Sequence, residues 1–166
     1  INFYNEIKSG RINAVIIRQF LKSEGQKLSK KGQDYYYEVR ERFNKTHSPF
    51  DFLFLNRACF NGVIRFNSNS KFNVPYGHKH ERFSQAYITK IVNQVKWVSD
   101  LVSLNDWEFL CQDFRITLST ATNRDFIYCD PPYIGRHTDY YNTWSEEDEK
   151  ALYKYLASNN ASFILS

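Results

Sequence analysis

The chain has 166 residues, of which 42% are apolar and 24% are charged, and this balance excludes an intrinsically disordered protein. Its length suits one domain, or one domain with an inserted lobe, and suffices to bury a core without disulfide or zinc crosslinks. No apolar run approaches the ~18 residues of a membrane helix, so we expect no membrane span. The net charge of +4 is too small by itself to indicate a nucleic-acid partner, so the distribution of charge matters more.

The three cysteines, Cys59, Cys111 and Cys129, are odd in number and have apolar neighbours. We therefore expect reduced, mostly buried thiols of a cytoplasmic protein, and no secretory segment. The sequence contains no Met and stops directly after an apolar run. These features lead us to expect a piece of a longer protein.

Helical periodicity dominates the first hundred residues. Apolar positions that recur every three or four residues predict helices at 11–22 and 82–102. We also predict a helix at 34–44, with Asp34 near its start, and a buried helix in the strongly apolar run at 50–59. Residues 23–33 are polar and include Gly25 and Gly32, which predicts a loop. Between residues 63 and 76, two short strand-like runs flank the turn-forming sequence NSNS, which predicts a β-hairpin.

The last third of the chain alternates between strand and helix patterns. We predict helices at 114–122 and 145–157, and strands at 107–111, 125–129 and 162–165, the second of them buried. Ser145 and Asp148 form a variant capping box at the start of the last helix. Because strands joined by a long connection pair in parallel with a right-handed crossover, this part is predicted to be an α/β sheet.

The sequence DPPY at 130–133 directly follows the predicted strand 125–129, where sheets of this class bind ligands. Two prolines stiffen the segment, so the Asp130 carboxylate, a proline carbonyl and the Tyr133 ring keep fixed relative positions. Such a segment can accept hydrogen bonds from both hydrogens of an amino group, and its tyrosine can stack on the flat ring that carries this group. The alternative is an ordinary Pro-Pro turn.

Residues 126–133 (FIYCDPPY) resemble the catalytic strand and loop of the Dam-type DNA adenine-N6 methyltransferases. Further motifs match the same family in the same order and spacing: LNR at 55–57, FNG at 60–62, RFN at 65–67 and FNVPYG at 72–77. The resemblance implies a partial Rossmann-like methyltransferase sheet with an inserted, mostly helical target-recognition lobe that carries the hairpin. It implies that residues 1–24 belong to the core, 25–106 to the lobe and 107–166 to the catalytic core.

The family resemblance also implies an activity: methyl transfer from S-adenosylmethionine to the N6 atom of an adenine flipped out of double-stranded DNA. It implies a catalytic role for Asp130, Pro131, Pro132 and Tyr133, with Tyr133 stacking on the adenine. It implies that Asp113, Phe114 and Asp130 contact the cofactor, although Asp113 also suits a helix N-cap. We expect a monomer that has neither a metal nor a membrane partner. His78 and His80 lack a third metal ligand in the sequence.

Positive charge gathers around the predicted hairpin, because residues 57–82 contain five Lys or Arg and one Glu. A two-stranded ribbon fits the major groove, and Asn side chains can pair with adenine edges. We expect DNA contacts from ten residues of this segment: Arg57, Arg65, Asn67, Ser68, Asn69, Lys71, Asn73, Tyr76, His78 and Lys79. A solvated hairpin is the alternative. Family members that read GATC carry an Arg at this tip, where this chain has Asn69 and Ser70, so the recognition sequence stays open.

The paired-glycine loop with which the family begins does not occur in this sequence. Two alternatives therefore stay open beside an active adenine methyltransferase. One is an amino methyltransferase that acts on cytosine-N4, RNA or a glutamine side chain. The other is a catalytically inactive DNA-binding remnant.

Overall fold

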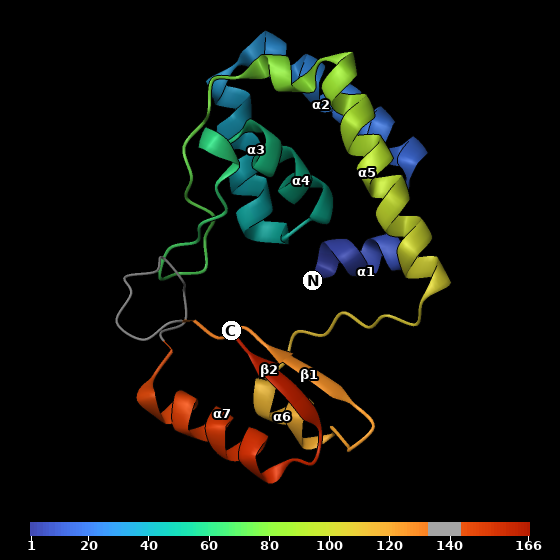
Figure 1. The fold of residues 1–166 in the computed structure, drawn as a ribbon. Coiled ribbons are helices and arrows are strands. Elements are labelled where there is room, and N and C mark those ends of the chain that lie inside the picture. Colours follow the sequence, from blue (N-terminus) through green and yellow to red (C-terminus); the bar gives the residue numbers. More distant parts are fainter. Residues whose placement is uncertain (133–143) are drawn as a thin grey trace. The chain divides into compact units, whose positions relative to one another are not determined.

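The computed structural model describes residues 1–132 and 144–166, which form two compact units, Ile1–Phe109 and Leu110–Ser166. The fold is mixed α/β and mostly helical, with one small parallel sheet among the described residues (Figure 1). Each unit has a hydrophobic cluster of its own. The two units are therefore described one at a time.

The first unit is built from five α-helices, four of which confirm the predicted helices, although α2 continues well beyond its predicted end. They are α1 (Asn2–Lys8), α2 (Ala14–Lys31), α3 (Gln33–Thr46), α4 (Pro49–Ala58) and α5 (Gln85–Leu104), with short 3-10 turns at Phe60–Gly62 and His80–Phe83. Asn13 caps α2, and Ser48 caps α4 with Pro49 at its first position. Their apolar faces enclose one core, which includes Leu21, Tyr36 and Phe54.

The prediction of a loop at 23–33 is wrong, because α2 continues without interruption to Lys31. Leu21, Glu24 and Leu28 extend its buried face through the polar stretch. Gly25 lies inside the helix, where a Cβ atom would come within 2.7 Å of the Phe83 Cβ. Gly25 is therefore needed for close packing against Phe83 and does not form a turn. The helix ends at Gly32, whose φ is +57°.

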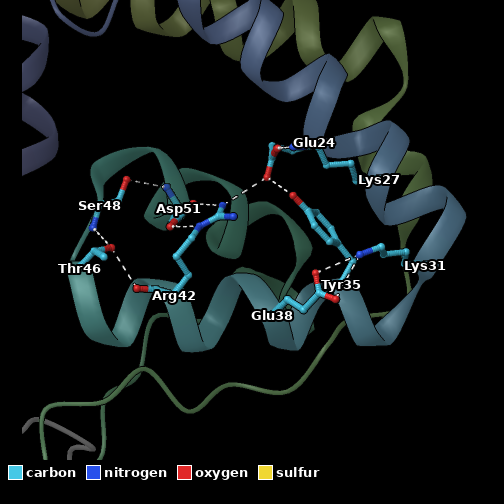
Figure 2. Close-up of polar contacts among 9 residues, drawn as sticks. All are labelled: Glu24, Lys27, Lys31, Tyr35, Glu38, Arg42, Thr46, Ser48 and Asp51. Atoms are coloured by element: carbon cyan, nitrogen blue, oxygen red, sulfur yellow. Dashed lines mark hydrogen bonds and ion pairs between the residues drawn. The ribbon is translucent and has the colours of Figure 1, made fainter.

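An ionic network joins α2, α3 and α4 inside this unit (Figure 2). Arg42 donates from Nε and Nη2 to the two carboxylate oxygens of Asp51, at 2.8 and 2.5 Å. Glu24 accepts from Lys27 Nζ and from the Tyr35 hydroxyl, both at 2.6 Å. Because Glu24 and Asp51 are only 4% and 3% exposed, these contacts satisfy carboxylates that burial would otherwise penalise.

Between α4 and α5 the predicted hairpin is present in a reduced form. It contains one antiparallel bridge, Phe66 to Phe72, around a turn, and a second bridge pairs Cys59 with Tyr76. The Asn67 Oδ1 atom accepts hydrogen bonds from the backbone N–H groups of Asn69 and Lys71, each at 3.0 Å. Asn67 thus builds the turn from within.

The second unit contains α6 (Phe114–Ser119), β1 (Phe126–Cys129), α7 (Glu146–Ser158) and β2 (Ser162–Leu165). As predicted, the strands pair in parallel, from Phe126 with Ser162 to Cys129 with Leu165, and α7 begins with the Ser145–Asp148 capping box. A small apolar cluster lies between α6 and α7.

Three expectations about this part of the chain are wrong. Residues 107–111 do not form a strand; the carbonyls of Trp107 and Phe109 accept hydrogen bonds from the side chains of Lys8 and Asn5 in place of a neighbouring strand. The strand β1 is not buried, since Phe126 and Tyr128 are each 64% exposed in a sheet of only two described strands. Cys111 is an exposed thiol, whereas Cys59 is buried and Cys129 is half-buried.

Candidate active site and nucleic-acid interface

The predicted catalytic loop begins at the carboxyl end of β1. The backbone N–H of Ser166 donates to the Cys129 carbonyl at 2.9 Å, so the parallel pairing runs to the end of the strand. Asp130 follows directly and is exposed, while Pro131 and Pro132 are half-buried. Successive prolines fix the backbone there, so the carboxylate of Asp130 is presented at the sheet edge where ligands bind in this class of fold. Tyr133 lies outside the described residues.

A pocket of about 330 Å³ opens beside this loop within the second unit. Asp130 and Pro131 line one part of it, and α6 contributes Phe114 to the wall. The Phe114 ring lies 5.4 Å from the ring of Trp144, at an interplanar angle of 49°. Gln112 adds an amide, and the remaining lining is mostly apolar. A pocket with aromatic walls and a few polar groups suits a flat heterocycle such as a purine.

Asp113 plays a different part from Phe114, although the two are neighbours. Its carboxylate caps α6 by accepting from the Arg115 N–H at 2.8 Å, and it does not line the pocket. The Arg115 guanidinium pairs with Asp113 at 3.1 Å and with Asp148 at 2.6 Å, and lies over the Phe114 ring at 4.5 Å. The hydrogen bond from Arg115 lowers the pKa of Asp148 to about 2, helped by Ser145. The carboxylate of Asp113 thus holds the wall of the pocket in place.

In the first unit, the tip of the hairpin presents Ser68, Asn69 and Lys71 to solvent. Arg65 and Asn73, predicted as separate contacts, meet each other across the hairpin, with Arg65 Nε donating to Asn73 Oδ1 at 3.0 Å. The tip is therefore a small polar surface with one cation, braced by an internal side-chain hydrogen bond.

Tyr76 differs from the other predicted contacts because it is only 7% exposed. Its ring stacks on that of Tyr36 in α3, with centroids 5.2 Å apart. The ring of the exposed His78, a residue with a φ of +54°, lies 4.6 Å from the Tyr76 ring. Tyr76 therefore anchors the return segment of the hairpin and connects it to an exposed imidazole.

A polar hollow of about 430 Å³ lies next to the hairpin, and its charged lining consists of Arg57, Lys79 and Arg82 together with Glu81. Burial lowers the pKa of Arg57, and repulsion from Arg82 adds to the effect. The Nε atom of Arg57 is buried without a hydrogen-bond partner among the described residues, and its guanidinium lies 5.8 Å from the Tyr87 ring centroid. Three cations against the one carboxylate of Glu81 leave a net positive charge, which favours an anion such as a phosphate.

Several residues of these sites could not be singled out as site residues from the sequence. Arg82 contributed only to the charge count, yet it lines the hollow and donates to the backbone carbonyls of Arg57 and Cys59 at 3.3 and 3.4 Å. Gln112 and Trp144 carry no motif, although each lines the pocket beside Asp130. They are identified as site residues only because the fold brings them to these two cavities.

Residues 1–132 and 144–166 lack two further features. No cluster of three or more His, Cys, Asp or Glu side chains there is arranged to hold a metal ion. None of the helices in those ranges is both long and apolar enough to cross a bilayer.

Comparison with known proteins shows what the chain is similar to. All of residues 1–166 match the family described as D12 class N6 adenine-specific DNA methyltransferase. The chain is 33% identical to the DNA adenine methylase of Serratia marcescens over 129 residues, 72% of this chain and 45% of that protein. It is 39% identical to the DNA adenine methylase of Haemophilus influenzae over 105 residues, 60% of this chain and 34% of that protein.

A third relative comes from an archaeon. The chain is 39% identical to the type II methyltransferase M.MjaIII of Methanocaldococcus jannaschii over 110 residues, 62% of this chain and 36% of that protein. The matched segment thus spans less than half the length of each of these three relatives.

Proposed function

Because the chain belongs to the D12 class of N6 adenine-specific DNA methyltransferases, we propose that the full-length protein methylates the N6 atom of adenine at a specific sequence in double-stranded DNA. The observation that carries the proposal is the stiff Asp130–Pro131 segment at the end of β1, beside a pocket with aromatic walls. The parallel pair β1–β2 would be part of a Rossmann-like sheet. We also propose a monomer, because one chain carries both the catalytic loop and the hairpin, and a cytoplasmic location, because the three thiols are free.

The pocket fits the adenosine part of S-adenosylmethionine. Phe114 and Trp144 would contact its adenine ring, and Gln112 would offer an amide to the ring edge. Asp113 would act by capping α6 and holding Arg115 behind Phe114. When bound, the cofactor supplies a methyl group on a sulfonium sulfur, which leaves as a neutral thioether when the methyl group is transferred.

The loop would act on the other reactant, the adenine amino group. Its nitrogen is a poor nucleophile because the lone pair is delocalised into the ring. The Asp130 carboxylate and the Pro131 carbonyl would accept its two N–H groups and favour a tetrahedral nitrogen with a free lone pair. Methylation replaces one N–H bond by N–C, so one proton must leave, and the Asp130 carboxylate would receive it. Tyr133 would stack on the base, and Pro132 would keep the loop rigid.

The first unit would bind the duplex. Asn69 and Lys71 at the hairpin tip would enter the major groove, and Ser68 would add a hydroxyl there. Arg57, Lys79 and Arg82 would hold a phosphate in the hollow beside it, and the exposed His78, which precedes Lys79 in the chain, would add a further contact. Arg65, Asn67 and Asn73 would shape the hairpin, through the hydrogen bonds that they make within it.

The test is methylation of plasmid DNA from a host that lacks adenine methylation. We expect the full-length protein with S-adenosylmethionine to modify adenines within one sequence context, detected by single-molecule sequencing. Modified cytosines in place of adenines would support the cytosine-N4 alternative. Sequence-selective DNA binding without any transfer would support an inactive DNA-binding remnant.

A further inference from the structure

The hairpin between α4 and α5 has little pairing of its own to hold its shape. Its strands share one bridge, Phe66 to Phe72, made by two backbone hydrogen bonds: from the Asn67 N–H to the Lys71 carbonyl at 2.9 Å, and from the Asn73 N–H to the Arg65 carbonyl at 3.3 Å. An isolated two-stranded hairpin is at best marginally stable in water, and short irregular strands specify their register weakly. A surface that reads bases needs a fixed register, so other contacts must supply it.

The side chain of Asn44, near the end of α3, supplies the first of these contacts. Its Oδ1 atom accepts from the Phe72 N–H at 2.8 Å, and its Nδ2 atom donates to the Phe72 carbonyl at 3.1 Å. These two bonds are the pair that a residue of a neighbouring antiparallel strand would form. A helix side chain therefore takes the place of a third strand. The return segment of the hairpin lies along α3 in Figure 1.

A second contact lies two residues further along the return segment. The Tyr36 hydroxyl donates to the Val74 carbonyl at 2.7 Å, and Arg40 Nη1 lies 3.4 Å from the same oxygen. Tyr36 is completely buried, and its ring stacks on Tyr76. Tyr36, Arg40 and Asn44 are spaced four residues apart, which places them on one face of the helix.

We propose that this face of α3 sets the register of the hairpin, and that Asn44, Tyr36 and Arg40 are positioning residues for sequence recognition. The proposal rests on the proposed DNA-binding function. A register shift of one residue would turn every side chain of the return segment to the opposite face. Asn44 holds Phe72 directly after Lys71, so it determines which side chains of the tip face the bases, without touching DNA.

The test compares sequence preference in the full-length wild type and in Asn44→Ala. A random duplex pool is selected by binding, and plasmid DNA is methylated in parallel, so that binding is read independently of transfer. We expect Asn44→Ala to reduce the ratio between preferred and single-base-altered sites about tenfold, the order of one good base contact. The methylation rate at saturating preferred DNA should change much less. The matched control is Asn93→Ala at an exposed position of α5, which should keep the wild-type preference.

A second variant covers the case in which Asn44→Ala does not fold. Tyr36→Phe removes only the hydroxyl that bonds Val74 and keeps the stacked ring, so we expect a smaller loss of preference in the same direction. Wild-type preference in the folded variants would overturn the positioning role, as would a wild type that binds DNA without any preference. Selective binding by a wild type that transfers no methyl would contradict the proposed activity alone, and the binding arm would still decide the positioning role.

Discussion

Asp130 is the residue on which the proposed chemistry depends most. In Asp130→Asn the shape of the side chain is kept, but the charge and one acceptor of the amino protons are lost. We expect methyl transfer to fall about a hundredfold or more, the usual scale for a missing proton acceptor. DNA binding should stay within about threefold, because the carboxylate would contact a base and not a phosphate.

The measurement is the single-turnover rate at saturating DNA and cofactor, with binding followed separately by fluorescence anisotropy. Asp106→Asn, at an exposed position of the first unit, is the control and should transfer at the wild-type rate. A rate for Asp130→Asn within tenfold of wild type would contradict the role of Asp130.

Single residues show where sequence reasoning reaches its limit. Asp130 and Pro131 could be predicted, because a short motif after an apolar strand determines their place in the fold. Tyr76 could not be placed, because the same pattern fits an exposed contact and the buried ring that stacks on Tyr36. Trp144 carries no local signal and gains its meaning only from Phe114 beside it.

Among the elements, α2 contains a glycine whose role can be tested. In most exposed helix positions Gly→Ala stabilises by about 1 kcal/mol. In Gly25→Ala the new methyl would come within 2.7 Å of the Phe83 Cβ, so we expect a net destabilisation of about 1–3 kcal/mol. Urea unfolding of the variant and of Ser29→Ala, an exposed position of the same helix, measures the difference. A gain in stability for Gly25→Ala would show that Phe83 moves away at little cost.

The hairpin allows a second prediction at the same scale. Asn69 lies exposed at its tip, whereas Lys79 lines the hollow beside Arg57. We expect Asn69→Ala to change which bases are accepted near the methylated adenine. Lys79→Ala should weaken binding to all duplexes and reduce the slope of log affinity against log salt by about one. Titrations at several salt concentrations on preferred and scrambled duplexes separate the two effects. An unchanged salt slope for Lys79→Ala would remove it from the phosphate site.

The type of most elements could be predicted from the sequence, but the residues at which they end and the elements that they contact could not. The helices α4 and α7 could be predicted because their apolar positions and their capping residues, Ser48 and Ser145, agree locally, whereas α3 has no side-chain cap. The end of α2 could not, because Gly25 reads as a turn former until Phe83 is seen packed against it. The strand predicted at 107–111 failed for a similar reason. Side chains of α1, far away in sequence, bind its carbonyls.

At the scale of the whole molecule, the two units differ in how they are stabilised. The first has a large core crossed by the ionic network of Figure 2, and the second has a small cluster beside an exposed sheet. Burial acts to raise the pKa of Glu24, but hydrogen bonds from Lys27 and Tyr35 outweigh it, so the pKa lies below its ordinary value of 4.5. A carboxyl whose folded pKa is lowered stabilises the fold above its unfolded pKa, and this contribution disappears as the pH falls through the folded value.

We therefore expect Glu24→Gln to lower the free energy of unfolding at pH 7 by about 1–3 kcal/mol, the range for hydrogen bonds to charged groups. The difference from wild type should shrink as the pH falls below 4.5, because the wild-type carboxyl then becomes protonated. Urea unfolding at a series of pH values measures both effects. Glu38→Gln is the control, because Glu38 is 55% exposed in its pair with Lys31 and should contribute less than about 1 kcal/mol. A difference for Glu24→Gln that does not depend on pH would contradict the assignment.

The contact between Asn44 and Phe72 also affects how recognition can diverge. The Asn44 side chain binds the backbone of the return segment, and backbone groups are the same whatever side chains the tip carries. Residues 67–71 can therefore be exchanged, or the turn lengthened, while the scaffold behind them stays as it is. In a chimera that carries the tip of another methyltransferase, Asn44 would hold the new tip in the same position without further changes. New target sites can arise in such a lineage by small local replacements.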